Sequence, residues 1–321
     1  MASAPILVIA WINRNGRTED LGYWLGAEVR FMPWAWPGLP LPRRMLSWLR
    51  SGFSTAAAVR RLRHGTVIVV EPPVFAPLVA WAARRSGCRL FLDLHSGALI
   101  APNWRWARPL LRFVARRCDG IITTNRETLH GFDIGGTPSY VLHDPLWARP
   151  RPAGSAPGAD PSRPYVLFPA SANPDEPFAL VEQVGAVLEG DPLIRVTGRV
   201  NRSGCTGVEY VGFLPQEEYL QMLSGAAAVL ALTEWEATMQ RSAYEAVGAG
   251  VPVVALDRRV LRQLFDGGGA LFAAPEPHDI ARAVREALEH RDRLSEETSR
   301  SRQRMKAESE IVKEALLGRA T

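Results

Sequence analysis

The stretch TEWEATMQRSAYEAVGAGVPVVALD (233–257) carries the clearest structural signal in the chain. An apolar run ends at Thr233 and a short polar loop follows. Small and apolar residues at helical spacing then predict a helix over 238–249. Gly250 ends this helix and Pro252 opens a second apolar run. A strand, a helix and a second strand in this order are typical of a parallel α/β sheet.

The same alternation of apolar runs and helix-like segments extends along the chain. The predicted strands are 5–10, 28–33, 66–71, 89–94, 120–124, 165–170, 193–198, 208–212, 227–233 and 251–257. The predicted helices lie near 42–63, 73–86, 103–117, 125–132, 176–189, 216–224, 239–249, 258–265, 277–290 and 294–317. This order predicts the α/β class, with two Rossmann-like domains that face a cleft. Ligands of such sheets bind at the carboxyl ends of the strands.

A change in composition divides the chain near its middle. The segment 146–164 is rich in Pro, Gly, Ala and Ser and has no apolar period, so it predicts a linker. It separates an N-terminal Rossmann-like domain, 1–145, from a second one, 165–293. The charged segment 294–321 predicts a final helix, either exposed to solvent or packed back on the first domain.

Composition excludes several classes of protein. The 321 residues are 47% hydrophobic and 22% charged, which is typical of a globular chain. No apolar run reaches the length of a membrane span, and the start, MASAPILVIAW, lacks the basic segment of a signal peptide. The three cysteines have no CxxC spacing, so we expect a reducing, cytoplasmic location. The net charge of +5 comes almost wholly from arginine, since only two lysines are present.

The start of the helix over 238–249 is a candidate phosphate site. Free backbone N–H groups near Thr238, Met239 and Gln240 suit a diphosphate. Glu245 lies two turns into the helix, where a carboxylate can accept hydrogen bonds from ribose hydroxyls. The alternative interpretation is an ordinary amphipathic helix with a surface glutamate.

This region resembles the donor-binding region of GT-B glycosyltransferases, especially bacterial members of family 4. That family carries Glu, seven residues and a second Glu, followed by Ala-x-x-x-Gly-x-Pro. Glu245, Ala246, Gly250 and Pro252 match the second half. Seven residues before Glu245 stands an alanine, and the nearest acidic residue is Glu236. The resemblance implies that Glu245 binds ribose and that Glu236 contacts the transferring sugar.

Further segments resemble the same family. The run VGFLPQEEYLQMLSGAAAVLALT (211–233) implies that Phe213 and Leu214 frame the nucleobase. SANPDEPFALVEQV (171–184) resembles a loop and helix in which Ser171 and Asn173 donate to phosphate or sugar oxygens. VTGR (196–199) resembles a turn in which Gly198 allows close approach and Arg199 holds the diphosphate. The lysine that many relatives place near these loops has no counterpart here.

The loop after the first strand is a second candidate phosphate site. Asn15, Gly16 and Arg17 follow the apolar run directly, without a full GxGxxG pattern. NAD binding is therefore poorly supported. The resemblance implies that this loop lies near donor phosphates and the acceptor, and the alternative is an ordinary turn.

Polar residues also follow the strand 89–94. His95 can hydrogen-bond to a sugar or transfer a proton, and the resemblance assigns it to the donor sugar. Asp93 is either the catalytic base of an inverting enzyme or the group that orients His95. Glu71, at the end of another strand, is a weaker candidate.

The segment 31–65 interleaves tryptophans with arginines. This pattern favours a membrane surface as a partner, through 34–63, although core tryptophans beside a solvated basic face would look the same. No nucleic-acid-binding motif accompanies the charge, so we expect no nucleic-acid partner. HExxH, GxSxG, Asp-x-Asp and clustered His/Cys patterns are all missing from the sequence, so we expect no metal site.

These observations predict a metal-independent, retaining glycosyltransferase. It would move a sugar from a nucleotide-sugar donor, which is a substrate rather than a cofactor, to a hydroxyl of an acceptor that is lipid-linked or a specialised metabolite. We expect no cofactor. The alternatives are a sugar-nucleotide epimerase of the same fold and a non-catalytic subunit that binds nucleotide and regulates a partner transferase.

Overall fold

The chain folds into two α/β units. The computed structural model describes residues 4–33, 40–100, 102–146, 163–236 and 238–318. The first unit is Met1–Arg149 with Lys306–Thr321, and the second is Pro150–Met305. Almost all of the predicted linker, 146–164, lies outside the described residues.

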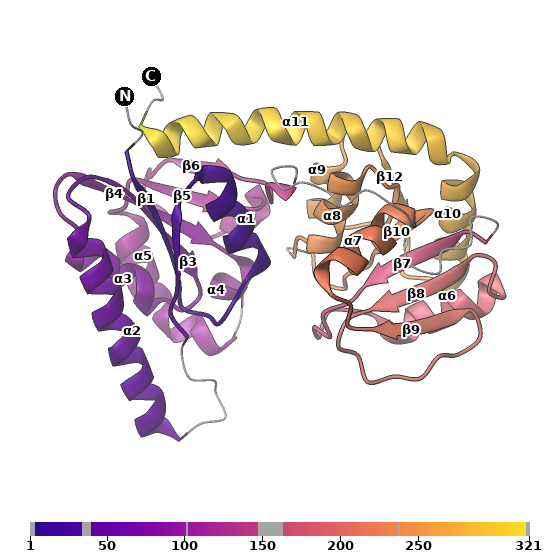
Figure 1. Cartoon of the computed structure of the whole chain (residues 1–321), viewed down its shortest axis with the longest axis horizontal. Helices are drawn as coiled ribbons and strands as arrows, with labels where there is room; N and C mark the ends of the chain where they lie inside the picture. Colours follow the sequence, from indigo (N-terminus) through magenta and orange to yellow (C-terminus); the bar gives the residue numbers. More distant parts are fainter. Residues whose placement is uncertain (1–3, 34–39, 101, 147–162, 237, 319–321) are drawn as a thin grey trace. The chain divides into compact units, whose positions relative to one another are not determined.

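The first unit is built on a parallel sheet of six strands in the order β2-β1-β3-β4-β5-β6 (Figure 1). Its strands are β1 (Ile6–Ala10), β2 (Glu28–Phe31), β3 (Gly65–Glu71), β4 (Cys88–Leu94), β5 (Gly120–Thr123) and β6 (Ser139–Val141). Its helices are α1 (Gly16–Leu25), α2 (Leu41–Arg61), α3 (Phe75–Ala83), α4 (Ser96–Ile100) and α5 (Arg108–Ala115), with short 3-10 turns η1 (Pro102–Ala107) and η2 (Arg126–Leu129).

Alternating side chains of these strands fill two hydrophobic cores. Val67 and Val69 of β3 face one core with residues of α2, α3 and α5. Ile68 and Val70 face the opposite core with residues of α1 and the last helix of the chain. Both faces of the sheet are therefore covered, which explains why its central strands are continuous apolar runs.

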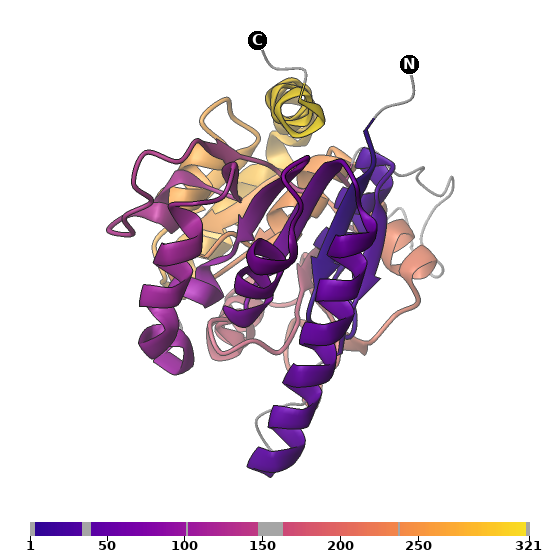
Figure 2. The same cartoon turned by 90° about the vertical axis from the view of Figure 1, so that its left-hand side faces the viewer.

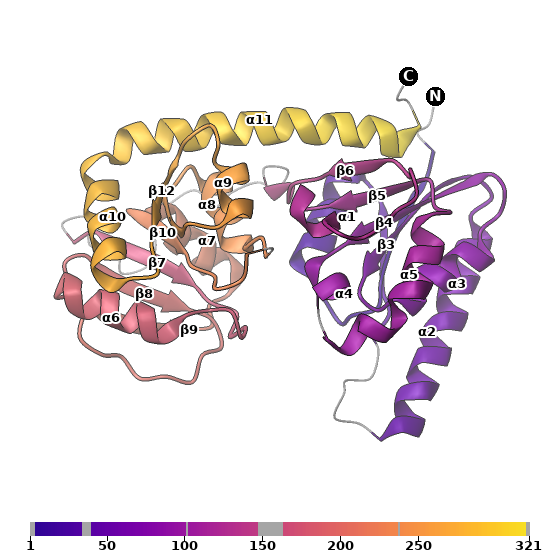
Figure 3. The same ribbon diagram turned by 180° about the vertical axis from the view of Figure 1, so that it is seen from behind.

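The second unit has its own parallel sheet, in the order β12-β11-β10-β7-β8-β9 (Figure 3). Its strands are β7 (Tyr165–Pro169), β8 (Leu193–Thr197), β9 (Val208–Gly212), β10 (Ala228–Ala231), β11 (Val253–Leu256) and β12 (Ala270–Ala273). Its helices are α6 (Phe178–Leu188), α7 (Gln216–Gly225), α8 (Arg241–Ala249), α9 (Arg259–Leu264) and α10 (Pro277–Glu289). The predicted α/β class with two Rossmann-like sheets is confirmed.

The last helix, α11 (Arg291–Leu317), contributes to both units. In the second unit, Thr298 Oγ1 donates a hydrogen bond to Gly269 O at 3.3 Å. In the first unit, the carbonyl of Leu316 accepts a hydrogen bond from Thr66 Oγ1 at 2.7 Å. Val312 and Leu316 are buried in the core that faces α1. No helix in the described part of the chain combines the length and apolar character that a membrane span requires.

Candidate functional site

The second sheet has a topological switch point between β7 and β10. The strand order runs outward in opposite directions from this pair, and sheets of this kind bind ligands at such a point, at the carboxyl ends of the strands. Thr233 Oγ1, after β10, donates a 2.6 Å hydrogen bond to Asp175 Oδ2, after β7. The backbone N–H of Glu234 donates to Asp175 O at 3.0 Å. The buried Asp175 thus ties the two loops together and does not begin α6.

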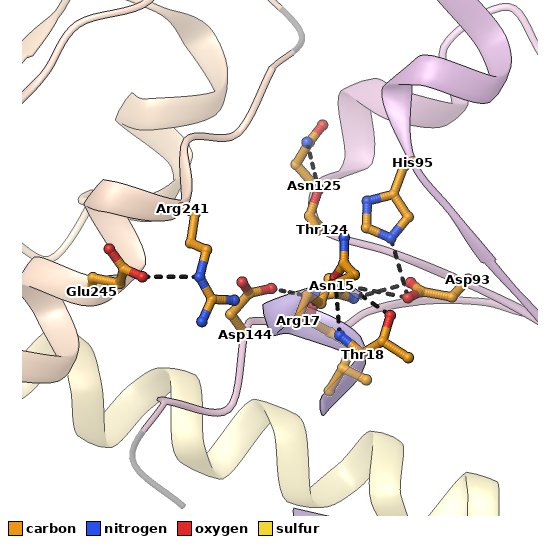
Figure 4. A network of polar contacts seen from close by, with 11 residues as sticks. Asn15, Arg17, Thr18, Asp93, His95, Thr124, Asn125, Asp144, Arg241 and Glu245 are labelled. Carbon is orange, nitrogen blue, oxygen red and sulfur yellow. Dashed lines mark hydrogen bonds and ion pairs between the residues drawn. The ribbon is translucent and has the colours of Figure 1, made fainter. Parts of the chain in front are cut away.

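Glu245 lies on α8, which follows β10 at this switch point, and its carboxylate is held on both oxygens. Tyr219 of α7 donates its hydroxyl to Oε2. Arg241, one turn earlier on α8, donates from Nε to Oε1 at 2.9 Å (Figure 4). Each carboxylate oxygen has a second lone pair, so Glu245 can still accept hydrogen bonds from a ligand. Burial, followed by the charge of Glu245, raises the pKa of Tyr219 well above its usual value, so this phenol remains a donor.

The start of α8 differs from the prediction. The helix begins at Arg241, with Gln240 as its N-cap residue, rather than at Thr238. Gln240 Nε2 donates a 2.7 Å hydrogen bond to Leu232 O, which folds this segment onto the end of β10. Thr238 Oγ1 and Gln240 Oε1 are buried and have no hydrogen-bond partner among the described residues. Thr238, Met239 and Gln240 thus form an extended approach to the helix that retains unused polar atoms.

The backbone N–H groups of the loop after β7 are hydrogen-bonded to a carboxylate of the same loop. The backbone N–H groups of Ser171 and Asn173 both donate to the carboxylate of Glu176, at distances of 2.8 and 3.1 Å. The backbone N–H groups of Ser171 and Asn173 are thus occupied by Glu176, and the prediction that these residues donate to a ligand stays a prediction. A carboxylate satisfies them locally, as it satisfies orphan donors at a helix start.

Glu236 braces its loop against α9. Its Oε1 accepts from Arg258 Nη1 at 3.1 Å, and its Oε2 accepts from the backbone N–H of Arg259 at 3.3 Å. Arg258 also donates from Nε to the carbonyl of Thr233 at 3.0 Å. Glu236 remains exposed, so it combines a bracing role with access to solvent.

The turn after β8 approaches the loop after β7 closely. Gly198 has a φ of +111°, and a Cβ there would lie 2.0 Å from the carbonyl oxygen of Ala170, so only glycine fits. The guanidinium of Arg199 lies 4.7 Å from the ring centre of Phe213, which is largely exposed. Leu214, next in the chain, is half-buried. Arg199, Phe213 and Leu214 therefore lie together beside the carboxyl ends of β8 and β9.

The first sheet has its own switch point, between β1 and β3. Asn15 caps α1, since its Oδ1 accepts from the backbone N–H of Thr18 at 3.1 Å. Gly16, the first residue of α1, is exposed. Arg17 is buried, which corrects its prediction as a phosphate ligand. Its guanidinium donates to both oxygens of Asp93, at 3.0 and 3.2 Å, and to Asp144 (Figure 4).

This pairing also corrects the prediction of Asp93 as a catalytic base. Burial opposes the charge on Asp93, but Arg17 and then His95 outweigh burial and hold its pKa well below the usual range. A fully buried carboxylate with this pKa is a poor proton acceptor. His95, which is partly exposed, lies with Nε2 3.3 Å from Asp93 Oδ2. This contact is compatible with the other role considered for Asp93, the orientation of His95, which stays a prediction.

Glu71 ends β3 at the same switch point. It is 1% exposed, and neither carboxylate oxygen has a hydrogen-bond partner among the described residues. Burial, with a further contribution from the charge of Asp93, raises its pKa well above the usual value. The buried position therefore favours the neutral form of the Glu71 carboxyl group.

Across the described ranges, no three His, Cys, Asp or Glu side chains are grouped closely enough to hold a metal ion. The cationic groups near the second switch point are instead arginines, Arg199, Arg241 and Arg258.

Comparison with known proteins agrees with this geometry. Residues 179–315 match the family model for glycosyl transferase-like domains, so this part of the second unit and of α11 is glycosyl transferase-like. No curated protein matches the sequence.

Solved structures match nearly the whole chain. HepE of Anabaena, solved with UDP-glucose, is 14% identical, with a TM-score of 0.70 over 98% of this chain and 100% of its own. The chain has the GT-B fold. Sucrose-phosphate synthase of Thermosynechococcus elongatus matches this GT-B chain at 13% identity and TM-score 0.66, over 98% of this chain and 96% of its own. A glycosyltransferase of Rickettsia africae matches at 9% identity and TM-score 0.65, over 99% of both chains.

Several residues of this GT-B chain contact the candidate site residues but were not predicted from the sequence. Tyr219 holds Glu245, Glu176 occupies the β7 loop, and Asp144 pairs with Arg17. Tyr219 falls within a segment predicted as a helix, and no local pattern marks it as a partner of a residue 26 positions away.

Proposed function

We propose that this chain transfers a sugar from a nucleotide-sugar donor to an acceptor hydroxyl. The observation that carries the proposal is the position of Glu245, held by Tyr219 and Arg241 on the helix that follows a topological switch point. This is where doubly wound sheets bind nucleotides, and an acidic side chain there pairs with ribose hydroxyls. The glycosyl transferase-like match covers the same helix.

In this proposal, the nucleoside diphosphate lies on the second unit. Glu245 accepts from the ribose, while Arg199 and Phe213 lie beside the base and diphosphate. The N–H groups of the segment Thr238–Gln240 and the Thr238 hydroxyl donate to the diphosphate, and Gln240 Oε1 accepts from a hydroxyl of the sugar. Negative charge grows on the departing diphosphate, and we assign its stabilisation to arginine and N–H groups rather than to a metal ion. Glu236 contacts the transferring sugar, His95 of the first unit hydrogen-bonds to substrate, and the anomeric configuration is retained.

Donor binding tests this proposal by calorimetry. UDP-glucose is the first ligand to titrate, because HepE was solved with it, followed by nucleotide sugars with other bases. Glu245→Ala is expected to weaken donor binding roughly tenfold or more, because the two proposed hydrogen bonds from the ribose hydroxyls to the Glu245 carboxylate are lost. Tyr219→Phe is expected to weaken it less, because Glu245 keeps Arg241.

Glu217→Ala is the matched control, since Glu217 is an exposed glutamate in the first turn of α7. Its affinity should equal that of the wild type. The proposal is wrong if no nucleotide sugar binds, or if Glu245→Ala binds as tightly as Glu217→Ala. Incubation with donor alone separates an epimerase, which would convert the donor, from a transferase.

Glu176 offers a second test of the same site. Its carboxylate places a negative charge in the loop after β7, at the switch point where the diphosphate is proposed to bind. Glu176→Gln removes this charge and is expected to strengthen nucleoside diphosphate binding roughly two- to fivefold, the scale of a solvent-screened charge pair. Weaker binding by this variant would mean that the Glu176 contacts shape the site rather than oppose the ligand.

A further inference from the structure

The helix α2 exposes an apolar stripe in the first unit. Leu46, Leu49 and Phe53 are spaced by three and four residues and so lie on one face. Together with Met45 they are between 52% and 75% exposed. The opposite face carries buried residues such as Thr55 and Val59, which pack on the unit. In Figure 2, the first half of α2 extends beyond the sheet of its own unit. A helix with apolar residues on both faces has one face unused by its own fold.

Basic residues border this stripe. Arg43 and Arg50 are exposed and lie seven residues apart, two helical turns, on one edge of it. Arg60 and Arg61 are exposed at the end of α2. The aliphatic stems of these arginines can pack along the apolar side chains, while the guanidinium groups extend toward solvent or an anionic partner.

The surrounding sequence contains no exposed negative charge. Residues 29–118 hold fifteen arginines and two acidic residues, Glu71 and Asp93. Both acidic side chains are buried, at 1% and 0% exposed. Arg30, Arg84 and Arg116 pair with carboxylates outside this range. The excess of positive charge that remains attracts an anionic partner.

A second exposed aromatic residue lies beside α2. The Phe75 ring lies 5.3 Å from the ring of Trp48, on α2, and 5.8 Å from the ring of Trp106, in η1. Trp106 is 62% exposed, and Arg105 next to it is exposed as well. The apolar stripe therefore continues, through Phe75, to an aromatic side chain and a further arginine.

We propose that this surface, Met45, Leu46, Leu49, Phe53 and Trp106 with the arginines around them, docks on an anionic lipid membrane. Apolar and aromatic groups would enter the interface between headgroups and acyl chains, while arginines pair with lipid phosphates. A second copy of this chain fits less well, because two copies of one face would bring arginines against arginines. The inference is independent of the proposed function, since it requires neither donor binding nor turnover.

Cosedimentation with vesicles tests the proposal. The full chain is mixed with phosphatidylcholine vesicles with and without phosphatidylglycerol. The wild type is expected to bind the anionic vesicles and to be released by salt. The triple variant Leu46→Ser, Leu49→Ser, Phe53→Ser should lower the partition coefficient at least about tenfold. Arg43→Gln with Arg50→Gln should also lower it roughly tenfold or more.

Ile311→Ser is the matched control, since Ile311 is 70% exposed but lies on α11. It should bind vesicles like the wild type. Circular dichroism checks that each variant is folded, and Phe53→Ser alone replaces the triple variant if that one is not. Equal binding to neutral and anionic vesicles would overturn the proposal. Vesicle binding that is unchanged in the stripe variants would also overturn it. So would light scattering that shows a dimer for the wild type and a monomer for the stripe variants.

Discussion

Replacing Arg17 by methionine is expected to destabilise the first unit by about 3–5 kcal/mol, the usual cost of removing one partner of a buried ion pair. Arg17 is the cation shared by Asp93 and Asp144, and all three side chains are buried. Methionine keeps the aliphatic stem but removes the guanidinium that pairs with both carboxylates, while His95 Nε2 remains 3.3 Å from Asp93 Oδ2. Differential scanning calorimetry would show a lower unfolding temperature for the variant.

The stability difference between wild type and Arg17→Met is expected to depend on pH. The pKa of Asp93 is lowered in the folded chain, so its contribution to stability is present above about pH 4, the range of an unfolded aspartate, and is lost as the pH falls. Without Arg17 the same buried carboxylate should have a raised pKa. Arg17→Met should therefore gain stability, relative to wild type, as the pH falls from 7 toward about 5.

Arg14→Met is the matched control, because Arg14 lies in the same loop but pairs with Glu19 at the surface. It should change stability little. Adding Asp93→Asn to Arg17→Met should recover part of the loss. If Arg17→Met unfolds like Arg14→Met, the buried network does not hold the first unit together.

Glu71→Gln is expected to stabilise the first unit at alkaline pH. The folded-state pKa of Glu71 is raised, so its contribution is fully present below about pH 4, the pKa range of an unfolded glutamate, and is lost as the pH rises through the folded-state pKa. Glutamine has the same shape but cannot ionise. At pH 8 we expect the variant to be more stable than wild type, by about 1.4 kcal/mol for each unit by which folding raises the pKa of Glu71.

Urea unfolding at pH 5 and pH 8 measures this difference. The stability difference between the two proteins should be smaller at pH 5, close to the pKa of an unfolded glutamate, and larger at pH 8. Glu127→Gln, a change at the partly buried 3-10 turn η2, serves as the control for a general effect of removing a carboxylate. A difference that is equal at both pH values, or that favours the wild type at pH 8, would contradict the prediction.

The central strands and most of the helices between them were predictable from the sequence, although α1 was not among the predicted helices. Both faces of each sheet are covered, so strands such as β3 are apolar runs of strand length, and Gly250 ends α8 as expected. The strands β6 and β12 were not predicted. Each is a short edge strand that exists through pairing with one neighbour, β5 or β11. Residues 103–117 and 125–132 form 3-10 turns and shorter helices than expected.

The role of a side chain was predictable only where it follows from the residue's position within its own helix or loop. Glu245 follows from its place two turns into a helix after a loop. The role of Arg17 does not, because its partners Asp93 and Asp144 lie 76 and 127 residues away. An arginine after a strand has the same local sequence whether it binds a ligand or neutralises buried carboxylates. That difference arises from tertiary contacts alone.

The contribution of α11 to both units determines the order in which they can be completed during synthesis on the ribosome. The second unit has all its residues once Met305 has emerged, whereas the first still lacks Val312 and Leu316 of its core. Translation therefore inverts the usual sequence of domain maturation, in which the N-terminal domain matures first. Until the last turns of α11 emerge, the nascent first unit exposes Val8, Ile68 and Val70, the surface that a chaperone would recognise.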